Sequence, residues 1–197
     1  MAMRDELRRF RDKVRTINAD QYLSRLKKAG WFEGQSERVI QAIARRVRRA
    51  FSSNPGEAFY ALADVRFEID CIEDEGSYEG ALMQLSEISR GRFRPNDLSD
   101  EVDFDEGVAR ISFELDGDSF EREFEQTRGW FSGEALELVN EALEANDCDE
   151  RFIALPRNDV TVDICFVQQE IFDRAVDMGL IPDADVYALD DETSVDD

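Results

Sequence analysis

The sequence predicts an α+β protein in which a helical N-terminal segment is followed by a mostly antiparallel sheet with flanking helices. Three observations carry this prediction. Apolar residues in the first 52 positions recur at helical spacing. Several later segments alternate apolar and polar residues with the period of two that is typical of strands. An Asp-Gly pair between two such alternating segments is the sequence signal of a β-hairpin.

The first 54 residues are expected to form a basic helical segment. Apolar residues between Leu7 and Ile17 lie on one face of a first helix. Asn18 is a candidate N-cap of a second helix that Gly30 ends, and a third helix is expected over 35–51. Arginines form a stripe beside the apolar face of the first helix and lie on the far side of the third helix from its apolar face. The basic face that we infer consists of Arg4, Arg8, Arg11, Arg15, Arg45 and Arg49.

A break at Ser52-Ser53-Asn54-Pro55-Gly56 precedes a first α/β unit over 55–107, to which the helix 35–51 also belongs. Residues 91–107 contain Pro95 and a run of acidic residues and are expected to form an exposed loop. The regular elements expected before this loop are strands at Phe59–Leu62 and Val65–Ile69 and a helix over 77–89.

A β-hairpin is the clearest local prediction. Two alternating apolar runs flank Asp116-Gly117, and both central residues of a two-residue hairpin turn must take positive φ, which Asp-Gly favours. In this register Phe113 faces Phe120, and Arg110 faces Glu123. The polar face of the hairpin then carries Glu114, Glu121, Glu123 and Glu125.

The hairpin opens a second unit over 108–182, and an acidic tail over 183–197 is expected to be frayed. The other elements expected in this unit are a helix over 133–146, strands at Phe152–Leu155 and Val160–Val167, and a helix over 168–178.

The chain contains a short internal sequence repeat. Gly30-Trp31-Phe32-Glu33-Gly34 recurs as Gly129-Trp130-Phe131-Ser132-Gly133, and the two copies contain both tryptophans of the chain. An amphipathic helix, two short apolar segments and a further helix follow each copy. This order predicts a duplicated α-β-β-α unit; the alternative is coincidence between common helix entries. The Trp-Phe pairs themselves are typical of hydrophobic staples at helix entries.

The composition is that of a folded globular protein. Of the 197 residues 42% are apolar and 10% aromatic, which is too much apolar surface for a disordered chain. No apolar run reaches the roughly 18 residues of a membrane helix, and the charged start MAMRDELRRFRDKVR does not resemble a signal peptide. The 3 cysteines are scattered, without CxxC spacing, so neither a disulfide framework nor a zinc knuckle is expected. We therefore expect a reducing, cytoplasmic location and no membrane.

The net charge of −22 is unevenly distributed. Residues 1–52 contain 14 Arg and Lys against 6 Asp and Glu, whereas residues 53–197 contain 10 against 40. Such asymmetry is an argument about partners, since a strongly acidic surface attracts basic proteins and repels nucleic acid. Salt adaptation is an alternative explanation. It predicts an acidic excess over the whole surface, and the first 52 residues have the opposite balance.

The residues that usually carry catalysis are scarce. The chain has no histidine, which excludes Ser-His-Asp and Cys-His nucleophiles and most zinc sites. There is no GxxxxGK[ST] loop and no GxGxxG motif. The cysteines lie in apolar or acidic surroundings, where thiols react slowly. We expect no nucleophile and no cofactor.

Two acidic clusters, 73–75 and 100–106, are candidates for a metal site. The second departs from the EF-hand loop, because Val108 stands where that loop requires glycine. We expect solvated loops, no metal and no enzyme. A carboxylate-dependent enzyme, such as a two-carboxylate glycosidase, is the third hypothesis, since folding can bring its residues together from distant positions.

The leading hypothesis is an acidic inhibitor of the immunity or antitoxin kind that binds a basic toxin or nuclease by charge complementarity. A structural or adaptor component that docks on a protein or nucleic acid through its basic N-terminal helices is the second hypothesis; these helices would otherwise neutralise the chain's own acidic part. The residues expected to contact a basic partner are Glu114, Glu121, Glu123, Glu125, Asp100, Glu101, Asp103 and Asp105.

Overall fold

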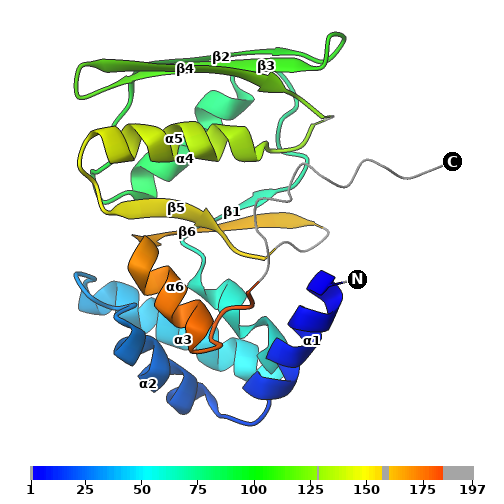
Figure 1. Ribbon diagram of the computed structural model, residues 1–197, viewed down its shortest axis with the longest axis vertical. Helices are drawn as coiled ribbons and strands as arrows, with labels where there is room; N and C mark the ends of the chain where they lie inside the picture. Colours follow the sequence, from blue (N-terminus) through cyan, green and yellow to red (C-terminus); the bar gives the residue numbers. More distant parts are fainter. Residues whose placement is uncertain (1, 128, 157–159, 184–197) are drawn as a thin grey trace, which may run out of the picture. The chain divides into compact units, whose positions relative to one another are not determined.

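The computed structural model describes residues 2–127, 129–156 and 160–183. In these ranges it contains seven helices and two three-stranded antiparallel sheets, which confirms the α+β class. The chain divides into two compact units, residues 2–63 with 167–183 and residues 64–166 (Figure 1). The expected segments 55–107 and 108–182 both contribute strands to the second unit. Of the expected tail 183–197, all but Asp183 lies outside the described residues.

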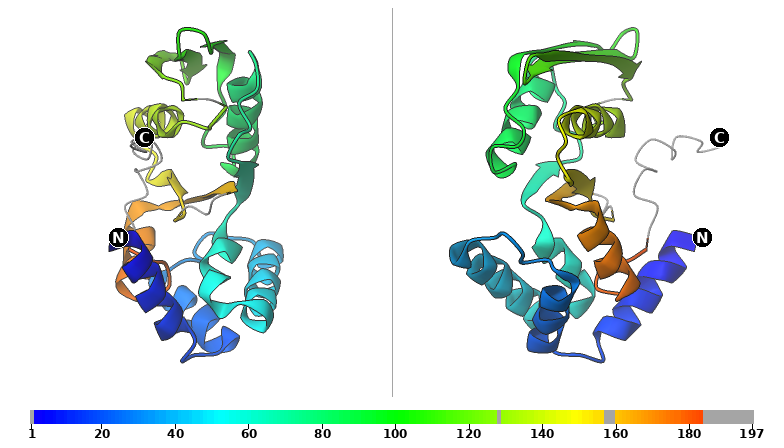
Figure 2. Two further views of the ribbon diagram at one scale, coloured as in Figure 1. Left: turned by 90° about the vertical axis from the view of Figure 1, so that its right-hand side faces the viewer. Right: turned by 60° about the vertical axis from the view of Figure 1, so that its left-hand side comes forward.

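The first unit is helical (Figure 2). Its core includes Phe10, Leu26, Val47 and Phe59, all buried, from four different elements. The three expected N-terminal helices are confirmed, and the C-terminal helix packs with them. The elements are α1 (Ala2–Val14), α2 (Ala19–Ala29), α3 (Glu37–Ser53), the 3₁₀-helix η1 (Pro55–Leu62) and α6 (Gln169–Asp177).

Helix α2 has the ends that the sequence predicts. The side chain of Asn18 accepts from the backbone of Gln21, whose side chain accepts from the backbone of Asn18, forming a capping box. Gly30 ends the helix with a φ of 94°, in the left-handed region that glycine adopts without strain. The hydroxyl of Tyr22 donates to the carbonyl oxygen of Leu180 at 2.6 Å and so ties α2 to the segment after α6.

The expected strand at Phe59–Leu62 is wrong, because this segment belongs to η1. Pro55 occupies the first turn, where its fixed φ and missing N–H favour helix initiation. Asn54 caps the helix by accepting from the backbone of Gly56. The buried Phe59 and Leu62 are three residues apart, which is the repeat of a 3₁₀-helix.

The second unit has three layers: α4 and α5 lie between the sheet of β2, β3 and β4 and the sheet of β1, β6 and β5 (Figures 1 and 2). One apolar core joins the layers and is rich in phenylalanine. The elements are β1 (Val65–Glu68), α4 (Ser77–Ile88), β2 (Asn96–Asp103), β3 (Val108–Leu115), β4 (Asp118–Glu125), α5 (Gly133–Ala145), β5 (Glu150–Ala154) and β6 (Thr161–Gln168).

The predicted hairpin is confirmed as β3 and β4. Asp116 and Gly117 have φ values of 53° and 97°, as a two-residue hairpin turn requires. Phe113 pairs with Phe120, and Arg110 pairs with Glu123. The two phenyl rings stack with centroids 5.6 Å apart.

The expected loop over 91–107 is wrong in its middle part, because residues 96–103 form strand β2. Leu98, Asp100 and Val102 point inward, and a carboxylate in the middle of this set obscured the alternation. Asp100 is buried because it replaces the missing cap of α4, whose N-cap residue Gly76 has no side chain. Its carboxylate accepts from the backbone amides of Gly76, Tyr78 and Glu79 at 3.0–3.4 Å.

The predicted duplication is also wrong at the level of structure. The first copy continues as helix, 3₁₀-helix and strand, whereas the second continues as helix, strand and strand. The glycines that open the copies differ as well. Gly30 is left-handed, whereas Gly129 lies against the backbone of Ile72, where a Cβ would come within 2.8 Å of the carbonyl oxygen. Similar local sequences therefore enter different tertiary surroundings.

Candidate protein-binding face

One surface of the second unit collects most of the acidic residues that the sequence singled out. Helices α4 and α5 cover the inner side of the sheet β2-β3-β4, so alternate residues of each strand point to solvent. The register places Glu101, Arg110 and Glu123 side by side across the three strands. The acidic face is the set of outward carboxylates Glu101, Asp103, Glu114, Glu121, Glu123 and Glu125.

Arg110 is the cation at the centre of the acidic face. Its guanidinium lies 2.5 Å from Glu123, 3.4 Å from Glu101 and 3.6 Å from Glu121. The hydrogen bond to Glu123, followed by the charge of that carboxylate, raises the pKa of Arg110. One guanidinium neutralises only part of six carboxylates, so the face keeps a strongly negative potential.

Two of the eight predicted contact residues lie elsewhere. Asp100 points inward, and its carboxylate accepts a hydrogen bond from the N-terminus of α4. The expectation that Asp100 contacts a partner is therefore wrong. Asp105 is exposed in the turn between β2 and β3, at the end of the acidic face. The backbone amides of Asp105 and Glu106 donate to Asp103 at 2.9 Å, which holds this turn in place.

Three further carboxylates, on the inner side of β4, were not among the candidate residues chosen from the sequence. Arg122 points inward from β4 and contacts Glu134, Glu137 and Glu141 of α5 at 3.1, 3.3 and 2.7 Å. Partial burial lowers the pKa of Arg122. The hydrogen bond and charge of Glu141, together with the charges of the other two glutamates, raise it by more than burial lowers it, so the net shift of the pKa is upward. The spacing i, i+3, i+7 marks these glutamates as one helix face, but it does not reveal that this face lies beside β4.

The predicted basic residues lie on the helical unit. Five of them have exposed side chains: Arg8 and Arg11 on α1, Arg15 directly after α1, and Arg45 and Arg49 on α3. None of these five has a carboxylate within ion-pair distance among the described residues. The stem of Arg11 packs on Gly56, where a Cβ would lie 2.5 Å away. The side chain of Arg4 is outside the described part.

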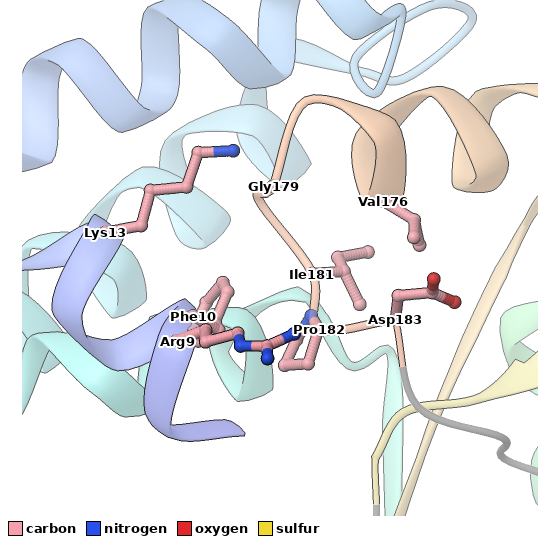
Figure 3. A pocket seen from close by; sticks show the side chains of 8 residues that line it. All are labelled: Arg9, Phe10, Lys13, Val176, Gly179, Ile181, Pro182 and Asp183. Atoms are coloured by element: carbon pink, nitrogen blue, oxygen red, sulfur yellow. The ribbon is translucent and has the colours of Figure 1, made fainter. Parts of the chain in front are cut away.

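The helical unit also contains a small cavity of about 160 Å³ between α1 and the segment after α6 (Figure 3). Arg9 and Lys13 line it from one side, and Ile181 and Pro182 line it from the other. Lys13 lies over Gly179, where a Cβ would overlap its ammonium group. Phe10 and Ile181 are almost fully buried, so the cavity offers little apolar surface to a ligand.

The cysteines are poor nucleophiles in this fold. Burial is the main cause that raises the pKa of Cys71 to about 11, and it also raises the pKa of Cys165 and Cys148. Across the described ranges, no group of three or more His, Cys, Asp or Glu side chains is arranged to hold a metal ion.

No helix among the described residues is long and apolar enough to cross a membrane. No protein-family model matches the chain, and the searches of curated proteins and of solved structures also find no match.

Proposed function

We propose that the chain is a binding protein that neutralises a basic protein, in the manner of immunity proteins and antitoxins. The observation that carries this proposal is the acidic face, in which three strands present six outward carboxylates and, among the described residues, one outward cation, Arg110. A rigid sheet, anchored on α5 through Arg122, holds these charges in a fixed array. A fixed array matches a complementary surface with little loss of side-chain freedom on binding.

The distribution of charge supports a basic partner. Residues 64–166 contain 29 Asp and Glu against 9 Arg and Lys, whereas the helical unit, counted as 1–63 and 167–183, contains 11 against 15. The negative charge therefore belongs to the unit that carries the acidic face. Complementary charge mainly accelerates encounter, and this acceleration is screened by salt.

The test is capture of partners from the source cell followed by stopped-flow binding across a salt series. The wild-type protein is compared with Glu121→Lys/Glu123→Lys, which reverses two charges of the acidic face. The matched control is Glu73→Lys/Glu87→Lys, which changes the net charge equally at exposed sites outside the face. We expect a basic partner whose association rate falls about tenfold or more from low to physiological salt, while dissociation changes less.

The face variant should associate more slowly than the control variant. Equal rates for the two variants would assign the effect to net charge alone. An acidic partner, or association rates that do not change with salt, would refute the proposal.

A second function is favoured by the exposed arginines Arg8, Arg15, Arg45 and Arg49, which have no carboxylate partner among the described residues. An adaptor that docks through its helical unit would use them on an anionic surface. Arg45→Glu/Arg49→Glu should then abolish capture of the partner, whereas Glu121→Lys/Glu123→Lys should leave it intact. This pattern is the reverse of the one expected for the acidic face.

A further inference from the structure

The two sheets expose four edge strands, and three of them are protected against pairing with another chain. Strand β1 is only 4 residues long. Strand β2 is interrupted by a register shift between Asn96 and Ser99, where Asp97 has a positive φ of 47°. On β5, the side chain of Asn140 donates to the carbonyl oxygen of Phe152 at 2.9 Å and accepts from its amide at 2.8 Å.

The fourth edge, β4, has an unpaired backbone in the part of the chain that the structure describes. Its one inward charge, Arg122, is a feature that can protect an edge, but it is engaged in ion pairs with the glutamates of α5. It is 8 residues long, pairs with β3 without any irregularity, and contains neither proline nor lysine. In a hairpin with a two-residue turn, alternate residues direct their amide and carbonyl groups away from the partner strand. On β4 these are Ser119, Glu121, Glu123 and Glu125, and no partner for their backbone amides exists among the described residues.

We propose that β4 is extended by an added strand, supplied by an extended segment of the partner that is rich in lysine and arginine. This proposal rests on the proposed function and specifies its mode of recognition. Backbone hydrogen bonds to β4 would supply affinity, and the side chains of the added strand would supply specificity.

The charges beside β4 determine the chemistry of the added strand. Outward side chains of that strand would lie next to Glu121, Glu123 and Glu125. Inward side chains would approach α5, where Glu137 and Glu141 are about half exposed and share the single cation Arg122. Both faces of the added strand therefore meet carboxylates, so lysine and arginine are favoured on either face.

A second copy of this chain is the wrong occupant. Antiparallel pairing of two β4 strands would place the glutamates of one copy opposite those of the other, and like charges across a strand pair are destabilising. The same glutamates that attract a basic strand thus oppose self-association.

The test uses two synthetic ten-residue probes of equal charge, an alternating Lys-Thr peptide and an alternating Lys-Pro peptide. Proline removes half of the amide donors and cannot join a strand pair. We expect the Lys-Thr peptide to bind about tenfold or more tightly than the Lys-Pro peptide at low salt, since several backbone hydrogen bonds are lost. Hydrogen exchange at the amides of Glu121, Glu123 and Glu125 should slow when the Lys-Thr peptide binds, with no change on β2.

A pair of protein variants tests whether the backbone amides of β4 take part in binding. Glu123→Gln and Glu123→Pro have the same charge, but only the second removes an outward amide, at an edge position that tolerates proline. The first should lose less than about threefold in affinity for the Lys-Thr peptide, and the second about tenfold. Urea unfolding checks that both variants are folded, and if Glu123→Pro is not, the peptide comparison and the exchange data decide.

Equal affinities of the two peptides, or protection of β2 instead of β4, would overturn strand addition. If Glu121→Lys/Glu123→Lys still weakens capture of the basic partner in that case, the proposed function stands and only its mode is wrong. Pairing of two copies through β4, seen as a dimer in light scattering, would also overturn the choice of occupant.

Discussion

At the scale of single residues, Asp100 shows how one carboxylate fixes two elements. It lies on β2 but accepts hydrogen bonds from three amides at the start of α4. A helix N-terminus carries a partial positive charge and unsatisfied donors, so a buried carboxylate is stabilising there. The outward direction of Glu101 and Asp103 follows from the inward direction of Asp100, because neighbours on a strand face opposite sides.

Asp100→Ala should therefore lower the free energy of unfolding by about 1–3 kcal/mol, since it leaves buried amides without an acceptor. Glu101→Ala is the control, because the neighbouring side chain is exposed, and its effect should stay within about 0.5 kcal/mol. Urea unfolding of the two variants measures both changes. Equal effects would show that Asp100 does not hold β2 on α4.

Cys71 is expected to react slowly. Its pKa is raised to about 11 from 9.0, so the folded protein keeps the protonated thiol to higher pH. At pH 8 the thiolate fraction is then about a hundredfold lower than in the unfolded chain. Alkylation of Cys71, followed by peptide mass spectrometry, should accelerate about tenfold for each pH unit between about 7 and 10. A rate that levels off near pH 8 would contradict the raised pKa.

At the scale of elements, the hairpin β3-β4 determines the acidic face. Its turn places the glutamates of β4 on one side and Phe120 and Phe124 on the other. A shift of one residue would exchange the two sides, so the turn geometry and the burial of the apolar side must agree. The left-handed conformation of Gly117 is thus a requirement of the acidic face as well as of the turn.

Gly117→Ala should destabilise the protein by about 1–2 kcal/mol, because a side chain at φ 97° is strained even though a Cβ meets no atom within 4 Å. Gly80→Ala should change the stability in the opposite direction. Gly80 lies within α4, also with nothing within 4 Å, so alanine should stabilise the helix by about 0.5–1 kcal/mol. Thermal unfolding of the two variants tests whether backbone conformation alone accounts for the difference.

At the scale of the whole molecule, the excess of negative charge is confined to one of the two compact units. The second unit carries the large acidic excess, whereas the helical unit has a small basic one. Like charges on one compact unit repel and reduce its stability. A surface that binds a basic partner is one reason for such an arrangement, and adaptation to salt is the other.

Added salt should raise the free energy of unfolding at concentrations as low as about 0.2 M, where the Debye length is already below about 10 Å. Glu121→Lys/Glu123→Lys should reduce this dependence. Urea unfolding in a sodium chloride series provides the measurement. A protein that folds only in molar salt would favour salt adaptation over recognition.

Metal binding is a further property of the whole surface that can be measured. Isothermal titration with calcium, magnesium and zinc should show no site tighter than about millimolar, because isolated pairs of surface carboxylates are poor ligand sets. A micromolar site that is lost in Asp103→Asn or Asp105→Asn would favour a carboxylate-dependent enzyme.

Features that depend on residues close together in the chain can be predicted from the sequence alone. The capping box of Asn18, the turn at Asp116-Gly117 and the side of the hairpin that carries Glu121 and Glu123 all follow from neighbours and strand alternation. Features that depend on distant partners become known only from the three-dimensional fold. Asp100 turned inward because α4 lacks its own cap, and the glutamates of α5 came to lie beside β4. The open edge of β4 belongs to the same group, since an edge exists only when the order of strands in the sheet is known. Local rules choose among a few backbone conformations, whereas burial, charge pairing and strand order depend on which distant segments the whole fold brings together.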